Sequence, residues 1–436
     1  TAQKIEAFDS SFDNLDKRTQ RIDIGDLNIA LLPKQTRGET VTVCMKFKSG
    51  DEKNLFGKAN LQPVAAAMLT RGTKTMTRSE IEDRMTELKM AGSITNFTTT
   101  RKNLPAALEL VFDAMHNSIM PQDEFDQFKK QMQVMIESMR DKPDALAQNA
   151  ITQHFNTYPK GDPRYEYSLD ESLEQLNKLT VDQVRAFYKE FGGTSRGEIS
   201  IVGDFDPKTV EKIIRDDYAK YVSKAHYAPV VTEYRPVKAT RVVIDTPDKE
   251  NAIIVARSVF PINDTAPDAP ALTVANWILG GGTGLSNRLI ERLRQKEGLS
   301  YGAGSHVRIP AKGDNGSFVF RAIVAPQNML QAEASARDVI AKAIKDGFTD
   351  QEVEEAKKGL LQAMQVARSQ DDVVARSWND KMENQRTWVF SKKQAEAISK
   401  LTTADVNAAL RKYIKPDEIT FVLAGDQKKA AQKKQD

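Results

Sequence analysis

Hydrophobic positions recur along the chain with two periods, one typical of helices and one typical of strands. From Phe125 to Met139 they return every three or four residues, which predicts one core-packed face of a long helix. From Val41 to Phe47 they alternate with polar residues, which predicts a strand with one buried face. Cys44 is on the polar face of that strand, so we expect it at the surface or at a second interface. The chain therefore mixes long helices with strands.

The same succession of elements occurs twice. A predicted helix that begins after Thr180 leads into a strand at 198–202, and one that begins after Thr402 leads into a strand at 418–422. In both copies 24 residues separate the leucine before the helix from the glycine after the strand. Thr180 and Gln183 form an S/T-x-x-E/Q capping box, which marks the first helix start. The chain is therefore an internal repeat.

The two copies differ in length at one place. The long helix has its counterpart at 353–367, a shift of 228 residues, whereas 68–73 matches 278–283 at a shift of only 210. The second copy thus holds 18 extra residues, including a predicted strand at 317–324. Either the first copy has a short or missing strand near 91–100, or a loop is absent from this numbering.

The repeats predict an α+β fold of two homologous domains, each a mainly antiparallel sheet covered by helices. A proline-containing stretch between the copies is typical of a linker, and the lysine-rich end is typical of a frayed, solvated tail. The expected parts are an N-terminal extension (1–17), a first repeat (18–225), a linker (226–237), a second repeat (238–428) and a polar tail (429–436).

Composition and charge limit the classes of partner that the chain is expected to bind. Hydrophobic residues make up 40% and charged residues 28%, as in globular proteins, and the net charge is only +3. This balance favours neither nucleic acid nor an acidic membrane surface as a partner, and no apolar run predicts a membrane span. The chain begins at Thr1 without a signal peptide, so we expect a processed chain or a fragment of a longer one.

Several kinds of catalytic site lack their residues. The closest two of the four histidines are 38 residues apart, so no H-x-x-E-H, H-E-x-x-H or H-x-H spacing exists, and we expect no metal site in this chain. Each histidine is expected at the surface or satisfied in the core. A G-x-S-x-G elbow is absent, and nothing places a base beside the single cysteine, Cys44.

A glycine run at Gly280, Gly281 and Gly282 allows two interpretations. It lacks the G-K-[ST] ending of a phosphate-binding loop, which argues against nucleotide binding. One interpretation is a helix-ending turn with glycines in left-handed conformations. The other is close approach of the backbone to a ligand, because glycine has no Cβ.

This run opens the string L-G-G-G-x-x-x-S-x-R-L-x-x-x-x-R-x-x-x-G-L-x-Y, from Leu279 to Tyr301. The string resembles the carboxy-terminal domain of insulinase/pitrilysin-type zinc metallopeptidases and of the related mitochondrial processing peptidases. Together with the repeated helix and strand motifs, the resemblance covers nearly the whole chain. It implies half of a clamshell whose domains of this kind enclose a chamber.

The resemblance also implies that the zinc motif has been lost. Family members carry H-x-x-E-H just before the segment that begins at Met68. In this chain alanines and other apolar residues stand at those positions, and alanine can neither ligate zinc nor activate water. A third family ligand would fall near Glu137 or Ser138. We therefore expect no activity from the chain alone and zinc only in a partner half. The five motif positions read Pro63-Val64-Ala65-Ala66-Ala67 here.

Arg294 and Tyr301 match the family's substrate-side pair residue by residue. In the family this pair comes from the half opposite the zinc, so the resemblance implies that both donors act in trans on an unfolded peptide that approaches along the glycine run. It also implies a bacterial periplasmic or envelope setting. Two alternatives stay open: a purely structural paralogue, as in the core subunits of respiratory complexes, and an autonomous peptidase with another mechanism.

Overall fold

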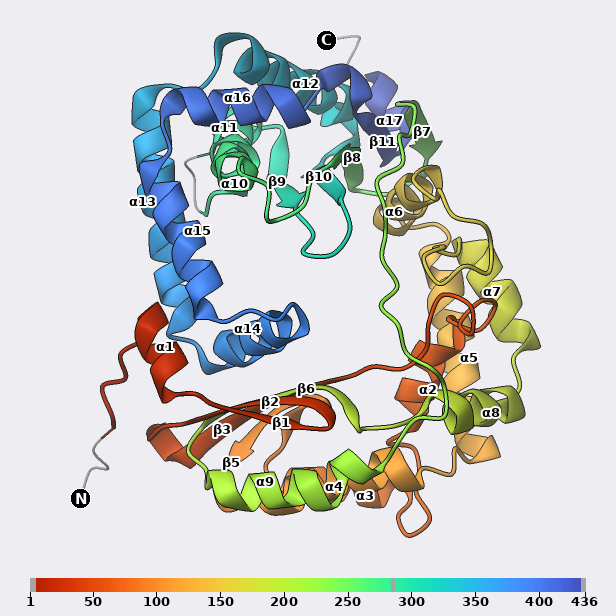
Figure 1. Cartoon of the computed structure of the whole chain (residues 1–436). Coiled ribbons are helices and arrows are strands. Elements are labelled where there is room, and N and C mark those ends of the chain that lie inside the picture. The colour runs from red at the N-terminus through yellow and green to blue at the C-terminus, as the bar shows by residue number, and fades with distance from the viewer. Residues whose placement is uncertain (1–4, 284–286, 433–436) are drawn as a thin grey trace.

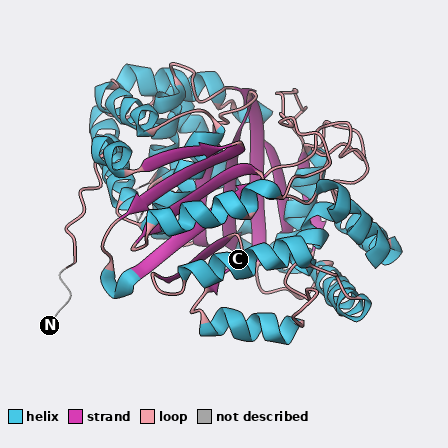
Figure 2. Cartoon of the chain, turned by 60° about the horizontal axis from the view of Figure 1, so that its bottom comes forward, coloured by secondary structure: helices cyan, strands magenta, loops and turns pink. Residues whose placement is uncertain are grey.

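Two β-sheets, one from each half of the chain, face each other across the molecule, with helices around them (Figure 1). Seen from below, the strands gather in the interior and the helices surround them (Figure 2). This computed structural model describes residues 5–283 and 287–432. Among the helices of these residues, none is long and apolar enough to cross a membrane.

The first sheet has six strands in the order β1-β2-β6-β3-β5-β4. Every neighbouring pair is antiparallel except β2 with β6. The strands are β1 (Gln20–Ile24), β2 (Asp26–Pro33), β3 (Thr40–Phe47), β4 (Ala91–Gly92), β5 (Asn96–Thr100) and β6 (Arg196–Gly203).

The second sheet has five strands in the order β7-β11-β8-β10-β9, and only β7 and β11 are parallel. Apart from β1, the two sheets therefore repeat one strand order and one pattern of directions. This confirms the predicted α+β fold with two mainly antiparallel sheets. The strands are β7 (Arg241–Asp245), β8 (Ala252–Pro261), β9 (Ser300–Arg308), β10 (Asn315–Val324) and β11 (Thr420–Gly425).

The helices follow the predicted alternation with the strands. In the first half they are α1 (Phe12–Arg18), α2 (Leu61–Met68), α3 (Arg78–Glu87), α4 (Leu104–Asn117), α5 (Gln122–Met139), α6 (Pro143–His154), α7 (Leu169–Lys178), α8 (Val181–Phe191) and α9 (Pro207–Asp216). In the second half they are α10 (Ala269–Asn276), α11 (Arg288–Ile290), α12 (Met329–Asp346), α13 (Asp350–Arg368), α14 (Asp371–Glu383), α15 (Trp388–Lys400), α16 (Thr403–Tyr413) and α17 (Gln427–Gln432), with π-helical segments η3 (Trp277–Gly281) and η4 (Glu291–Lys296).

Capping residues set the starts of several helices. The predicted box at the start of α8 is present, because Thr180 accepts a hydrogen bond from the backbone of Gln183, whose side chain bonds back. Its repeat counterpart, α16, begins with the same arrangement at Thr402 and Asp405. Both copies thus use one local signal to begin the helix that precedes the last strand.

Each half lends one helix to the sheet of the other half. Helix α6, from the first half, packs on β7, β8 and β11, where Ala147 and Ile151 are buried against Ile253 and Val255. Helix α14, from the second half, packs on β2, β3 and β6, and its Trp378 is 1% exposed. In Figure 1, α14 lies above the first sheet, on the side that faces the second sheet. This exchange joins the two halves through buried apolar surface.

The exchanged α14 corrects the prediction that β3 is buried on one face only. Thr42 and Cys44, on its polar face, are only 6% and 8% exposed, because α14 covers them. Cys44 therefore lies at the second of the two predicted locations, an interface. Burial raises the pKa of its thiol.

The abbreviated first copy is visible in its edge strands. Strand β4 has two residues where its counterpart β9 has nine, and β5 has five where β10 has ten. The backbone continues directly from β4 into β5, since Ser93 N–H donates to Asn96 O. Both edge strands of the first sheet are therefore shorter than their counterparts in the second sheet.

Two sequence expectations need correction. The stripe of α5 is buried only in part, since Phe125 is 2% exposed but Met135 is 41% exposed. At the chain end, residues 427–432 form α17 with Ala430 buried, whereas we expected a frayed tail. At the other end, α1 buries Leu15 and packs on α15, so the N-terminal extension contacts the second half.

Candidate functional site

Two π-helical segments flank residues 284–286, the part of the Leu279–Tyr301 string that lies outside the described residues. Segment η3 precedes it and η4 follows it. Asn287 is 1% exposed; its Nδ2 donates to Gly282 O over 3.1 Å and its Oδ1 accepts from Ile290 N over 2.9 Å. π-Helical turns are rare in proteins overall, but those that occur are often found at functional sites. Two of them in one region mark it as a candidate site.

Arg294 lies on η4, which is fixed from beneath. Leu293 is fully buried, and Arg292 forms ion pairs with Asp338 (2.8 Å) and Glu297, two residues that hold η4 against α12. Arg294 itself is exposed, and within the described residues no hydrogen bond or ion pair engages its guanidinium. The segment therefore presents a free cationic donor on an anchored backbone.

Tyr301 is exposed because of a β-bulge. The register between β9 and β10 shifts there: Gly302 opposes Ile323, but Ser300 opposes Val324, so Tyr301 is the extra residue. Its side chain is 64% exposed, while Ser300 is buried and donates to Gly302 O over 2.6 Å. A bulge of this kind re-aims a side chain, and here it turns a phenol hydroxyl towards solvent.

Segment η4 packs directly against β9. The fold thus brings Arg294 and Tyr301 onto adjoining elements, and both side chains are exposed. The pair offers a guanidinium and a phenol as hydrogen-bond donors to a ligand. The substrate role that we expect for them stays a prediction.

The glycine run does not form the predicted left-handed turn. Among the described glycines with positive φ, none is Gly280, Gly281 or Gly282. A Cβ on Gly280 would instead lie 2.5 Å from Ser305 Oγ and 2.8 Å from Ser305 N, and one on Gly281 would lie 2.4 Å from Asn276 Nδ2. The glycines therefore let η3 pack closely against β9 and α10, and the substrate-binding role that we expect for them stays a prediction.

An apolar pocket occupies the place of the zinc motif. The motif positions, 63–67, lie on α2, and Ala65 and Ala66 line a pocket of about 310 Å³ together with Met45, Phe187 and Phe191. Within the described residues, no three histidine, cysteine, aspartate or glutamate side chains come close enough to hold a metal ion. The residue set at 63–67 does not fit a zinc ion, because no ligand atom replaces the histidines.

The other residues considered as ligands have ordinary partners. Glu137 pairs with Arg140 on the surface of α5 at 3.5 Å. His226 Nδ1 lies 2.9 Å from Asp51, and His154 Nε2 lies 2.8 Å from the backbone oxygen of Lys238. For His154 and His226, these contacts match the expectation of a surface or satisfied position.

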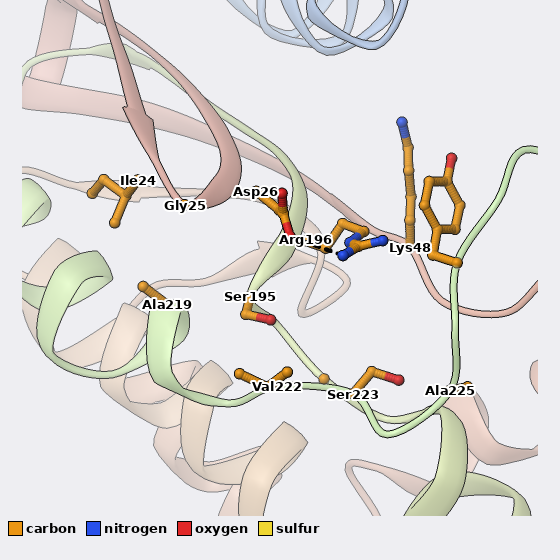
Figure 3. A pocket seen from close by; sticks show the side chains of 12 residues that line it. Ile24, Gly25, Asp26, Lys48, Ser195, Arg196, Ala219, Val222, Ser223 and Ala225 are labelled. Carbon is orange, nitrogen blue, oxygen red and sulfur yellow. Dashed lines mark hydrogen bonds and ion pairs between the residues drawn. The ribbon is translucent and has the colours of Figure 1, made fainter.

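A second cavity, of about 280 Å³, lies where the β1–β2 turn meets the start of β6 (Figure 3). Asp26 and Arg196 form an ion pair of 2.8 Å at its rim, and Lys48, also in its lining, pairs with Glu198 at 2.7 Å. The charged side chains that line the cavity, Asp26, Arg196 and Lys48, are therefore paired with residues of the chain.

The structure contains a buried charged group, at Arg257, that the sequence patterns did not identify. Arg257 interrupts the apolar strand β8, and its Nε is buried without a hydrogen-bond partner in the described part of the chain. A charged residue on the inward face of a core strand is the sequence signal that would have identified it.

The chain is similar in sequence to several known proteins. The family model described as "Peptidase M16 inactive domain" matches residues 178–360. An uncharacterised zinc protease of Mycobacterium bovis is 24% identical over 299 residues, which is 66% of each chain. The non-peptidase homolog YmxG of Helicobacter pylori is 20% identical over 404 residues, 88% of this chain and 89% of that one.

Solved structures share the fold. A peptidase M16 inactive domain from Pseudomonas fluorescens superposes with a TM-score of 0.79 at 20% identity, over 93% of this chain and 97% of that one. The periplasmic protease PqqL of Escherichia coli superposes with a TM-score of 0.64 at 14% identity, over 94% of this chain but 45% of PqqL.

Proposed function

We propose that the chain, whose residues 178–360 match the family model of the peptidase M16 inactive domain, is the silent half of a two-part zinc peptidase. In this role it closes a chamber against a partner half that carries H-x-x-E-H. One observation carries the proposal: an anchored, exposed pair of donors, Arg294 and Tyr301, survives in a chain whose five motif positions lack every zinc ligand.

The size of the chain supports a partner half. It corresponds to 45% of PqqL, and the first half of PqqL also superposes on it by itself, with a TM-score of 0.68. A second half of similar size, as a separate subunit or as part of the same polypeptide, would complete such an enzyme. Since PqqL is described as a periplasmic protease, we propose a periplasmic setting for this chain too.

The two donors fit a role in peptide hydrolysis. The partner would supply the attacking water through its metal. Arg294 and Tyr301 would donate hydrogen bonds to the peptide carbonyl oxygen, which gains negative charge in the tetrahedral intermediate. Because η4 and the bulge in β9 are both held by buried neighbours, little reorganisation would be needed. The substrate would be an unfolded peptide segment, and the glycine run would act by positioning β9.

A purely structural role is the second candidate. It is favoured by the match to YmxG over 88% of the chain, since that protein is described as a non-peptidase homolog. In that case the exposed pair would have no ligand, and its replacement would change no activity.

Reconstitution separates the two candidates. The zinc-bearing half is assayed on an unfolded peptide with and without this chain, and then with Arg294→Ala and Tyr301→Phe. Lys296→Ala is the matched control, because Lys296 lies on the same η4 segment and is 67% exposed. We expect the chain to accelerate cleavage, both site variants to lose the gain and the control to keep it. Equal rates for all four proteins would favour the structural role.

A further inference from the structure

Helix α6 covers only part of the second sheet. We call the side of that sheet on which α6 lies the α6 face. The helix packs on β7, β11 and β8 and reaches β10 through the Asp144–Arg321 ion pair, and the sheet surface beside it, over β10 and the edge strand β9, is hollowed. A groove of about 440 Å³ remains on them, lined by Gly302, Gly304, His306, Val319 and Arg321 among others. The open part of the α6 face therefore lies next to Tyr301 on the same strand.

Basic side chains lie on this open part and, at Arg257 of β8, directly beside it. In the strand ladder Arg257 opposes Val319 and Val319 opposes His306, so the three lie in one row across β8, β10 and β9. Arg308 opposes Ser317, two residues further along, and side chains two residues apart share a face. Arg257, His306 and Arg308 therefore point to the same side of the sheet.

Their charge is not neutralised within the described residues. The Nε of Arg257 is buried without an acceptor, its guanidinium lies 4.9 Å from the Phe155 ring centre, and burial lowers its pKa. Glu166 acts on it only at longer range, since no ion pair within 4.0 Å joins them. Arginine stays protonated even when buried. An anionic partner would therefore offset the free-energy cost of burying the Arg257 guanidinium without an acceptor.

The acidic groups nearby are already engaged or do not reach Arg308. Asp144, on α6, pairs with Arg321 at 2.5 Å. Arg308 borders a cavity that also contains Asp380 and Glu383, but the described residues include no ion pair between them, and Glu383 pairs with Lys46 at 2.7 Å. The open part of the α6 face thus keeps an excess of positive charge.

We propose that the open part of the α6 face binds an extended peptide segment that carries aspartate or glutamate side chains. Strand β9 is the last strand of its sheet, and edge strands can pair with an added segment. A Cβ on Gly302 would meet nothing within 4 Å, which leaves room for the peptide. Carboxylates match the guanidinium groups of Arg257 and Arg308. The inference rests on the proposed function in one respect: the bound segment would be part of the substrate.

The distance of the basic residues from Tyr301 predicts where acidic residues would lie in the bound peptide. His306 and Arg308 follow Tyr301 by five and seven residues, which in an extended strand is about 17 and 23 Å. If Tyr301 holds the peptide near the bond that is cut, the preferred acidic residues would lie roughly five to seven positions away from that bond.

Direct peptide binding tests the inference without the partner half. The full chain is titrated against a fluorescent extended peptide of roughly 12 residues with an acidic cluster. Its glutamine and lysine counterparts are titrated in parallel, and binding is read as fluorescence anisotropy. We expect the acidic peptide to bind at least about tenfold more tightly than the glutamine peptide, and this preference to fade at about 0.5 M salt.

Variants locate the binding surface. Arg308→Gln and His306→Gln change exposed residues and should weaken acidic-peptide binding about threefold to tenfold, with no effect on the glutamine peptide. Arg257→Gln should do the same, and its thermal unfolding is compared with wild type. The matched control, Arg215→Gln on α9, changes an arginine that is 54% exposed and should leave binding unchanged.

Equal affinity for the acidic and glutamine peptides would overturn the inference, and so would an undiminished preference in Arg308→Gln. Tighter binding of a single-stranded oligonucleotide of equal charge would overturn it as well, in favour of another class of ligand. These outcomes are independent of the reconstitution assay. A chain that binds acidic peptides but does not accelerate the partner would retain this inference and lose the proposed function.

Discussion

Replacing Trp378 with alanine would test whether the exchange of helices holds the two halves together. Trp378 lies on α14, is 1% exposed and packs among residues of the first half such as Leu15 and Val202. Its Nε1–H donates to Thr19 Oγ1 over 3.1 Å, and the guanidinium of Arg21 lies 5.0 Å from the ring centre. One side chain thus connects the second half to several elements of the first.

The expected cost follows from these contacts. Removing a buried tryptophan side chain costs about 3–5 kcal/mol, through lost burial and the cavity that remains. Trp378→Phe keeps most of the ring and loses the N–H donor, so about 1–2 kcal/mol is expected. Thr19 Oγ1 would still donate to Leu15 O, at 2.6 Å, so its hydroxyl would not become unpaired.

Urea unfolding followed by circular dichroism measures the free energy of unfolding. The matched control is Val389→Ala, which changes a residue of the adjacent α15 that is 48% exposed and should cost less than about 0.5 kcal/mol. The reasoning would be refuted if Trp378→Ala lowered the free energy of unfolding by less than about 1 kcal/mol. Equal losses for the alanine and phenylalanine variants would refute the part assigned to ring burial.

Three further predictions concern stability. Burial raises the pKa of Glu171, but hydrogen bonds to its carboxylate outweigh this effect and lower the pKa to about 2. Because this pKa is lower in the folded protein than in the unfolded chain, Glu171 stabilises the fold at pH values above its unfolded pKa. Glu171→Gln should therefore cost about 1 kcal/mol at pH 7 and flatten the loss of stability between about pH 4.5 and pH 2, measured by urea unfolding. Burial lowers the pKa of Lys381 to about 8. The buried charge therefore destabilises the fold below pH 8, and this penalty fades as the pH rises to the unfolded pKa of the lysine. Lys381→Met should thus raise the free energy of unfolding by about 1–3 kcal/mol at pH 7 and by much less at pH 10. Gly280→Ala should lower the melting temperature by an amount equivalent to about 1–3 kcal/mol, because its Cβ would meet Ser305, whereas Gly302→Ala, with open space around it, should stay within about 0.5 kcal/mol.

The repeat made much of the fold predictable. Matching strands and the capping residue Thr180 gave the succession of elements, because local signals at helix starts and alternating apolar positions act within a few residues. The exchange of α6 and α14 was not predictable. Burial of Thr42 and Cys44 depends on a helix more than 300 residues away in the chain, and no local period encodes that contact.

The candidate site divides in the same way. The resemblance singled out Arg294 and Tyr301, but no pattern predicted the π-helical segment that carries Arg294 or the bulge at Tyr301. The bulge arises from a register shift between β9 and β10, which no local period encodes. Of the two interpretations of the glycine run, one required positive φ values and the other a close approach to a ligand. Its actual requirement is close contact with Ser305, on a strand that lies about two dozen residues further along the chain.

The turnover number of the reconstituted peptidase tests the central claim most directly. With the zinc-bearing half present, Tyr301→Phe removes a single hydroxyl donor and should lower kcat by about tenfold to a hundredfold, with KM changed much less, because the donor acts mainly in the transition state. Arg294→Ala should lower kcat at least as much. An unchanged kcat for both variants, in a complex that still assembles, would contradict the claim that this silent half takes part in catalysis.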